Sequence, residues 1–464
     1  MRAYKFDYIR LIVILFTLFI LFQTLPVHFF ADNAEYLYLA KYYSHHPLKI
    51  FSVVPFALEN RGYIHHLFFY RPMERLFFTV NYIIGKLNPI PYNITQGLLF
   101  LILVVSIYNI VHLIANNRVS ALLSVTFFLL IPTNYRIVHW LGNSDILSSS
   151  LLCLSLYFLF SALKNNSFIH FFLGILVTFF AFLTKVSTAF TLPLLFYTFY
   201  LFYRKEYKLN KKLFYISLVY ILILMGCDSI FQYIANKDVK TYQYAQYLLY
   251  EINPKYILRN INLFYGMFYK SGFYPLLVCC LIITCLRPNK NALFFILWII
   301  FSSLPYLPLH CCSKRYFVYM AIGLCMFLGF VLSHYAKKPK NWSYWIGVIL
   351  VCIGVMGSIK GLSNNIKRIR YTFELRKTHY IKQKNNMNRL FKLPTNATIY
   401  VDDGYTRHFY SYMLSLINRD DIKIELASPD NMVKEFFFEG EVKTVKTDFK
   451  PYFTFVDKLG DWRF

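Results

Sequence analysis

The stretch from residue 19 to residue 47 reads FILFQTLPVHFFADNAEYLYLAKYYSHHP and contains the point where the first long apolar segment ends. Two acidic residues, Asp32 and Glu35, follow this point directly. The apolar segment, residues 9–30, is too long for a removable signal peptide and lacks a small-residue cleavage site, so we expect it to stay as a membrane anchor. The sequence therefore places two carboxylates at a membrane surface, in a chain with only 23 acidic residues.

The composition of the whole chain agrees with a membrane setting. Of its 464 residues, 57% are hydrophobic, 20% are aromatic and 16% are charged, with a mean hydropathy of +0.43. A single water-soluble core cannot bury so much apolar surface, so we expect a polytopic membrane protein. In such a protein a net charge of +26 indicates cytoplasmic loops and anionic lipid headgroups as partners, and no nucleic acid.

Apolar runs of about 15 to 23 residues, compared with the thickness of a bilayer, predict about eleven transmembrane helices. Their approximate limits are 9–30, 92–114, 119–135, 145–163, 168–184, 186–203, 212–227, 272–286, 291–308, 316–334 and 342–360. One or two of the shorter runs are also compatible with re-entrant segments. The predicted fold class is thus an all-α polytopic membrane protein, with its transmembrane domain over residues 1–362.

The basic residues of the short loops predict the orientation. They recur in every second connection, at Arg2, Lys5, Arg10, Arg118, Lys164, RKEYKLNKK from Arg204, RPNK from Arg287 and HYAKKPK from His334. Because Lys and Arg are retained on the cytoplasmic side, we expect the N-terminus inside and residues 363–464 outside, together with the loops 31–91 and 228–271. The basic stretch from Ile366 runs against this assignment, but long segments obey the rule weakly.

The first outer loop, residues 31–91, contains two runs that favour helices lying in the membrane interface. AEYLYLAKYYSHH (34–46) has Tyr and Leu on one side at helical spacing, and RPMERLFFTVNYIIGKL (71–87) is apolar but too short to span. If the first helix begins at Asp32, then Asp32 and Glu35 share a face at i and i+3. A structural alternative is that Asp32 caps this helix and Glu35 complements its dipole.

The C-terminal segment, residues 363–464, changes character. Residues 397–427 read as strand, helix and strand, and residues 440–458 as two further strands around a turn. We therefore predict a small α/β module at the outer face.

Several motifs, taken in order, resemble those of a known superfamily. They are ADNAEYLYLA (31–40), YRPMERLFFTVNYIIGKLNPIPYNITQGLLFL (70–101), RIVHWLGNSDILSSSLLCLSLYFLF (136–160), FFAFLTKVSTAFTLPLLFY (179–197) and SKRYFVYM (313–320). Over roughly residues 1–335 the chain resembles the GT-C superfamily of integral membrane glycosyltransferases, in the branch of the protein O-mannosyltransferases and the transmembrane-and-TPR mannosyltransferases. No helical repeats of the TPR type follow.

The chain departs from the pattern of that branch at three places. Asp32 matches the first of its two acids, and Asn33 or Glu35 stands for the second. Asn143 replaces a usual arginine in WLGNSD, and Val186 replaces a usual acid after Lys185. The fold is therefore predicted more firmly than the substrate.

The resemblance implies transfer of a sugar from a polyprenyl-phosphate lipid to a hydroxyl group of a glycan, lipid or protein acceptor, without a cofactor. Such a reaction needs a carboxylate base and a cationic clamp for the lipid phosphate. The predicted topology brings suitable residues to the outer face. We assign Asp32 as the base and Glu35 to acceptor positioning, Arg71, Arg75, Lys185 and Arg315 to the phosphate clamp, and Arg136, His139, Asp145 and Lys314 as further substrate-binding candidates.

No metal site is predicted, because the adjacent pairs His45–His46 and His65–His66 point apart and show no spacing to further ligands.

Two other functions stay open at this point. A transporter or flippase for lipid-linked glycans would use the same cations without chemistry, although the paired halves typical of transporters are not visible. A glycan polymerase or ligase would share the chemistry and differ in the acceptor. We expect the membrane to be a bacterial inner membrane.

Overall fold

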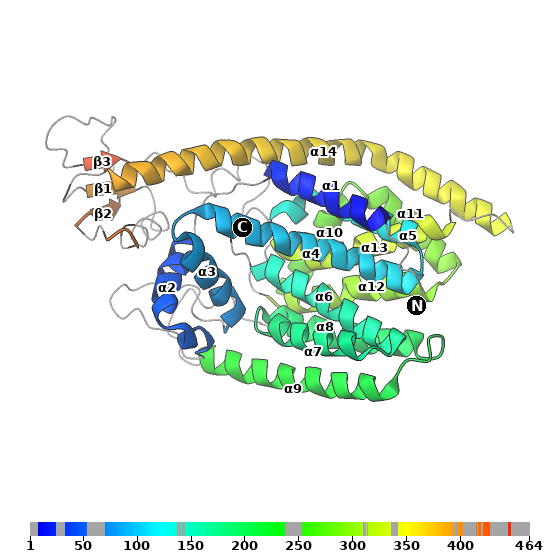
Figure 1. Ribbon diagram of the computed structural model, residues 1–464. Helices are drawn as coiled ribbons and strands as arrows, with labels where there is room; N and C mark the ends of the chain where they lie inside the picture. The colour runs from blue at the N-terminus through cyan, green and yellow to red at the C-terminus, as the bar shows by residue number, and fades with distance from the viewer. Residues whose placement is uncertain are drawn as a thin grey trace. The chain divides into compact units, whose positions relative to one another are not determined.

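In the computed structural model the described residues are mainly helical, with three short strands (Figure 1). It describes residues 8–24, 33–52, 70–136, 141, 144–236, 253–309, 312, 314–335, 342–392, 395, 398–401, 414, 416–418, 421–426 and 444–446. The chain forms two compact units, and each is described by itself below. Unit 1 comprises residues 1–24, 52–74 and 96–373, and unit 2 comprises residues 25–51, 75–95 and 374–464.

Most of the helices belong to unit 1. They are α1 (Tyr8–Thr24), α5 (Arg118–Leu129), α6 (Ser144–Asn165), α7 (Phe168–Phe182), α8 (Val186–Tyr203), α9 (Lys211–Asn236), α10 (Pro254–Lys270), α11 (Tyr274–Leu286), α12 (Lys290–Ser303) and α13 (Phe317–Tyr335), with the short 3-10 helices η2 (Pro132–Arg136), η5 (Leu304–Tyr306) and η6 (Lys314–Tyr316). Three further helices have residues in both units: α3 (Pro72–Gly85), α4 (Pro89–Ala115) and α14 (Trp342–Phe391).

Helices occupy all of the segments predicted to cross the membrane, namely α1, α4 to α9 and α11 to α14. Among the described residues, five helices are long and apolar enough to span a bilayer, or six if the bent pair α10 and α11 forms one span. The remaining apolar helices, such as α5 and α7, are shorter. The chain is therefore an integral membrane protein, and eleven spans stays a prediction.

Helix α10 lies in the segment predicted only as an outer loop, so that part of the prediction was too coarse. It meets α11 at an angle of 105°, through a turn in which Gly272 has a φ of +77°. A side chain at Gly272 would also collide with α14, since a Cβ there would lie 2.9 Å from the carbonyl oxygen of Gly361. Long apolar runs do not mark α10, because it is amphipathic: its buried residues Asn260, Phe264 and Met267 recur at helical spacing on one face, and polar residues such as Asn262 interrupt the apolar sequence.

Small residues allow α5 and α13 to approach closely. A Cβ on Gly329 of α13 would lie 2.8 Å from the carbonyl oxygen of Ser120 on α5, so glycine is required there. The hydroxyl of Ser120 also pairs with that of Ser333. Close backbone approach at small residues, joined by hydroxyl hydrogen bonds, is a common way for helices to associate in membranes.

Aromatic packing joins α6, α8 and α12. The rings of Phe160 and Phe199 stack with centroids 3.9 Å apart, and Phe294 contacts Phe199 edge-on at 6.2 Å. The hydroxyl of Tyr203 donates a hydrogen bond of 2.7 Å to the side-chain oxygen of Asn291. These contacts hold the ends of α6 and α8 together with the start of α12.

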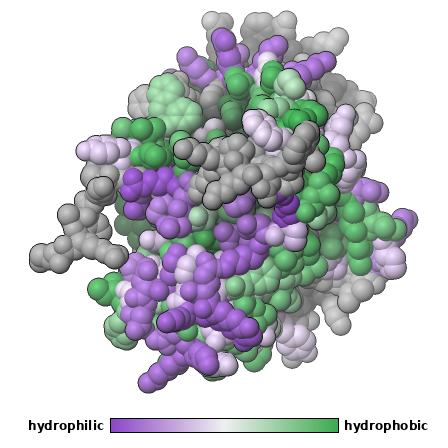
Figure 2. All heavy atoms as spheres, turned by 90° about the vertical axis from the view of Figure 1, so that its right-hand side faces the viewer, coloured by the Kyte–Doolittle hydropathy of each residue, from purple (hydrophilic) through white to green (hydrophobic). Residues whose placement is uncertain are grey.

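Hydrophilic residues gather on the face of the molecule seen in Figure 2. That face contains the ends of unit 1 where α6 and α8 finish and where α9 and α12 begin. The exposed basic side chains at these helix ends and in the adjoining turns include Arg204, Lys205, Lys211, Lys212 and Lys290. They lie in the connections that the sequence predicts to be cytoplasmic.

Unit 2 contains α2 (Asn33–His45), the 3-10 helix η1 (Pro47–Phe51), most of α3, and the strands β1 (Thr398–Val401), β2 (Lys423–Leu426) and β3 (Thr444–Lys446). Both α2 and α3 lie where interfacial helices are predicted, and they pack through Tyr36 and Phe78, whose rings stack at 4.7 Å. The strands form a parallel sheet in the order β2, β1, β3.

Helix α14 is 50 residues long and passes through residue 363, where the predicted outer module begins. At 1.5 Å per residue it measures about 75 Å, well beyond the ~30 Å of a hydrocarbon core. The basic stretch from Ile366 thus continues a helix that contains a candidate span, residues 348–371. The strands follow it in the segments where the sequence predicts strands, and an outer α/β module stays a prediction.

Candidate functional site

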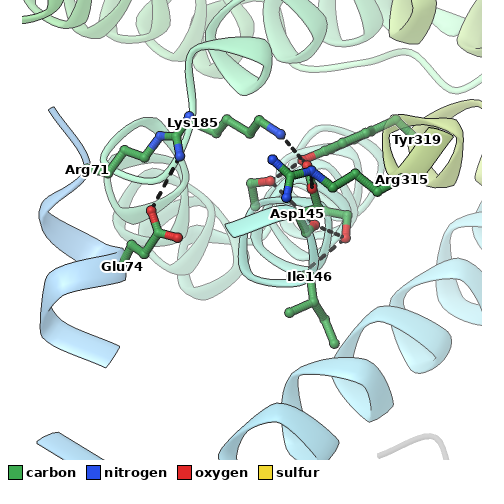
Figure 3. A network of polar contacts seen from close by, with 9 residues as sticks. Arg71, Glu74, Asp145, Ile146, Lys185, Arg315 and Tyr319 are labelled. Atoms are coloured by element: carbon green, nitrogen blue, oxygen red, sulfur yellow. Dashed lines mark hydrogen bonds and ion pairs between the residues drawn. The ribbon is translucent and has the colours of Figure 1, made fainter. Parts of the chain in front are cut away.

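Asp145 lies at the centre of a buried polar cluster in unit 1. It occupies the first turn of α6, where the positive end of the helix dipole favours a carboxylate, and its side chain is fully buried. One carboxylate oxygen, Oδ1, pairs with the Lys185 ammonium and accepts a 3.3 Å hydrogen bond from the Tyr319 hydroxyl. The other, Oδ2, lies 3.2 Å from Nε of Arg315. A single carboxylate therefore holds two cations (Figure 3).

Lys185 comes from the turn between α7 and α8. Its backbone is extended at the residue before α8 begins, and its side chain makes no capping hydrogen bond to that helix. The side chain is only 8% exposed. Its ammonium lies 4.1 Å from the centroid of the Tyr316 ring and within 6 Å of the rings of Tyr306 and Tyr319. Cation–π contacts and the ion pair with Asp145 together stabilise the buried charge.

The three tyrosines form an aromatic wall around this cation. Tyr306 stacks on Tyr316 with centroids 4.6 Å apart and lies 5.5 Å from Tyr319. The hydroxyl of Tyr319 also pairs with that of Ser148 on α6. The sequence analysis did not select these tyrosines, although Tyr316 and Tyr319 both belong to the quoted motif SKRYFVYM and Tyr316 directly follows Arg315.

Arg71 contributes a third cation from the residue before α3. Its Nη1 lies 3.5 Å from Oε2 of Glu74, and its charge also acts on the carboxylate of Asp145. The backbone N–H of Met73 donates a 3.2 Å hydrogen bond to the carbonyl of Leu183, which fastens the start of α3 to the end of α7, close to Lys185. Figure 3 shows Arg71 and Lys185 in one view of the network, on the same side of Asp145.

The three cations differ in the exposed fraction of their side chains, and therefore in how much surface each can offer to a bound anion. The side chains of Lys185 and Arg71 are 8% and 17% exposed, and that of Arg315 is 31% exposed. Arg315 therefore has surface left for a further anion after its contact with Asp145. Its planar guanidinium can bind two oxygens of a phosphate at once.

The cluster sits where two candidate spans begin. Asp145 is the second residue of α6, and Arg315 lies two residues before α13; both helices are long and apolar enough to cross the membrane. Ionisable groups at such positions are costly to bury, and they mark substrate or ion sites in membrane proteins.

The structure brings together four of the ten residues predicted for the site: Arg71, Asp145, Lys185 and Arg315. Arg75 belongs to unit 2, where it is buried and its Nη1 donates a 3.2 Å hydrogen bond to the carbonyl of Ile50. Glu35 lies in α2 of the same unit. Arg136 ends η2 and Lys314 begins η6. Asp32 and His139 lie outside the described residues.

No group of three or more His, Cys, Asp or Glu side chains that could hold a metal ion occurs in the part of the chain that the structure describes. The guanidinium and ammonium groups of Arg71, Lys185 and Arg315 are the groups in the cluster that can attract a phosphate.

Comparison with known proteins agrees with this fold. Residues 72–228, which include α3 to most of α9, match the family described as dolichyl-phosphate-mannose-protein mannosyltransferase. Among solved structures, the fold is similar to that of ArnT from Cupriavidus metallidurans, crystallised with undecaprenyl phosphate, with a TM-score of 0.51 and 13% sequence identity over 89% of each chain. The search of curated proteins found no match. The family match and the shared fold confirm the resemblance of this chain to the GT-C superfamily of integral membrane glycosyltransferases.

Proposed function

We propose that the chain transfers a sugar from a polyprenyl-phosphate donor to an acceptor hydroxyl at the outer face of the membrane. The observation that carries this proposal is the buried cluster in which Asp145 holds Lys185 and Arg315 at the start of two candidate spans. The match of residues 72–228 to a family of lipid-phosphate-sugar transferases supports it, as does the undecaprenyl phosphate bound to ArnT.

In this proposal Arg315 binds the donor phosphate, because it keeps the largest exposed fraction of the three cations. Lys185 contacts Asp145 and the ring of Tyr316, so it adds positive charge to the site without touching the phosphate, and it fixes the position of Asp145. Arg71 adds a second guanidinium at the edge of the cluster. The positive charge offsets the negative charge that builds up on the leaving phosphate.

The reaction that follows is a single displacement. The acceptor oxygen forms a bond to the anomeric carbon as the bond from that carbon to the phosphate oxygen breaks, and the polyprenyl phosphate leaves with both bonding electrons. Asp32 takes the proton of the acceptor hydroxyl, and Glu35 positions the acceptor. The lipid donor cannot leave the bilayer, so the reacting groups must gather at one membrane face. We place that face outside, in a bacterial inner membrane, with the N-terminus in the cytoplasm.

Reconstitution separates this activity from transport. Liposomes containing the protein are given polyprenyl-phosphate donors with a radiolabelled sugar, and the label is separated into lipid, glycan and protein fractions. A transferase moves label from the donor lipid into an acceptor fraction. Label that changes leaflet but stays on the lipid would instead identify a flippase and contradict the proposal. The fraction that gains label also separates a glycan polymerase or ligase from a protein or lipid glycosyltransferase.

A further inference from the structure

Helix α9 carries one acidic residue, Asp228, and the structure buries it. The rest of α9, from Lys211 to Asn236, contains no other acid, and Asp228 is only 5% exposed. Residues 211–234 are long and apolar enough to span the membrane. A carboxylate within such a segment is costly, so its position calls for a function.

Asp228 contacts Gln232, one helical turn further along α9. Nε2 of Gln232 donates a 3.2 Å hydrogen bond to Oδ1 of Asp228. This contact fixes which end of the Gln232 amide carries the donors, because a carboxylate accepts hydrogen bonds and cannot be paired with the amide oxygen.

In this orientation the Gln232 amide forms hydrogen bonds to both the carbonyl and the N–H of Tyr70. Nε2 of Gln232 donates to the Tyr70 carbonyl at 2.9 Å, and Oε1 accepts from the Tyr70 N–H at 3.2 Å. Gln232 is itself buried. A side-chain amide that satisfies both polar groups of one residue replaces the pairing that a neighbouring strand would provide.

Tyr70 immediately precedes Arg71, so the two hydrogen bonds between Gln232 and the Tyr70 backbone fix the position of the Arg71 backbone. The ring of Tyr70 also packs against Phe231 at 5.0 Å and against Leu183. Beyond Arg71, the N–H of Met73 is held by the Leu183 carbonyl at 3.2 Å. The backbone is therefore fixed on both sides of Arg71. The charge of Arg71 also acts on the carboxylate of Asp228.

We infer that Asp228 and Gln232 are a positioning pair that presents the Arg71 guanidinium to the phosphate of the lipid donor. The inference rests on the proposed function, in which Arg71 belongs to the phosphate clamp. It gives a role to Asp228, the buried acid of α9, which is not a member of the cluster around Asp145.

A double-mutant cycle tests the pair through a readout that a purely structural residue would not change. The variants are Gln232→Met, which keeps volume but removes all three hydrogen bonds, Arg71→Gln, and their combination. Initial rates of sugar transfer are measured against donor and against acceptor concentration. Arg71→Gln should raise the donor KM about tenfold or more through a lost charge-assisted hydrogen bond. Gln232→Met should raise it by a similar factor with little change in the acceptor KM.

In the Arg71→Gln background, Gln232→Met should change the donor KM by less than about twofold, because its effect passes through Arg71. The matched control is Asn365→Leu, which removes another buried amide that donates to a distant backbone carbonyl, that of Ser271. This control should lower thermal stability and leave the donor KM unchanged. If Gln232→Met does not accumulate, Gln232→Glu serves in the same cycle, since it keeps the volume and an acceptor for the Tyr70 N–H.

The outcomes are distinct. Two results would overturn the positioning pair while leaving the clamp intact. One is an unchanged donor KM in the Gln232 variant. The other is a donor KM in the double variant that rises by the product of the two single-variant increases. A normal donor KM in Arg71→Gln alone would remove Arg71 from the clamp, and the positioning pair with it. Non-additive effects confined to the donor support the inference.

Discussion

Arg315 Nε lies 3.2 Å from Oδ2 of Asp145, so Arg315 and Lys185, which come from distant parts of the chain, share one buried carboxylate. This contact divides the two cations by task. Lys185 is enclosed by Asp145 and three tyrosine rings, whereas Arg315 keeps part of its surface exposed.

Removing the central carboxylate should destabilise the protein more than removing the whole buried pair. Asp145→Leu leaves the Lys185 ammonium buried beside no acid, which costs about 3 to 5 kcal/mol in comparable buried pairs. The double variant Asp145→Leu with Lys185→Met should recover most of that loss, because the buried ammonium is gone and Arg315, which also loses its acid, has a side chain that is 31% exposed. Thermal unfolding in detergent measures both. Equal losses in the single and double variants would contradict the ion pair.

Arg315→Gln should weaken use of the donor lipid and leave acceptor use nearly normal. The loss of a charge-assisted hydrogen bond to phosphate is worth about 1.5 to 3 kcal/mol, or roughly ten- to a hundredfold in the donor KM. The donor KM of Arg315→Lys should lie between those of the wild type and Arg315→Gln, since lysine keeps the charge but lacks the planar guanidinium. Initial rates at varied donor concentration check this, and a normal donor KM in Arg315→Gln would remove Arg315 from the clamp.

The ring of Tyr316 should matter more than its hydroxyl. Tyr316→Phe keeps the aromatic face 4.1 Å from the Lys185 ammonium, so it should behave nearly as the wild type. Tyr316→Leu removes that face and should lower stability by about 1 to 2 kcal/mol, the range of a desolvated cation–π contact. Comparing the midpoints of thermal unfolding of the two variants tests the contact. The reverse order of stability would show that the hydroxyl, and not the ring, is the important group.

Asp32→Asn should remove turnover while donor binding and expression persist. General-base catalysis contributes about a hundred- to ten-thousandfold, so the rate should fall by that factor. If Asp32 only caps α2, the asparagine would cap nearly as well and activity would stay near normal. Glu35→Gln should be less damaging. A transfer rate above about a tenth of normal in Asp32→Asn, or a larger loss in Glu35→Gln, would reassign the base.

Reporter fusions should locate the two faces of the membrane. Fusions after Asn210 and Lys338 should read as cytoplasmic, because their connections are basic, and fusions at Asn60 and Asn431 should read as external. A cytoplasmic signal at Asn431 would mean that the number of spans is even. The C-terminal strands would then lie on the face opposite to the proposed site.

The sequence alone determined where the apolar helices lie, and it predicted which cations bind a phosphate. Apolar runs predicted α4, α6 and α13 closely, because the energy of burying a helix in lipid depends on local composition. Lys185 and Arg315 were found through short motifs that need no knowledge of contacts. The helix α10 was missed because it is amphipathic, with its buried residues on one face, and therefore contains no long apolar run.

The tertiary structure decided what these residues do to one another. Asp145 was selected as one of several substrate-binding candidates, and only the fold shows that its carboxylate holds Lys185 and Arg315. The same is true of Tyr306 around Lys185 and of Gln232 at the backbone of Tyr70. The physical reason is range. Helix formation and membrane insertion follow from neighbours in the chain, whereas an ion pair in a buried site depends on which helices meet, and no local pattern of residues records that.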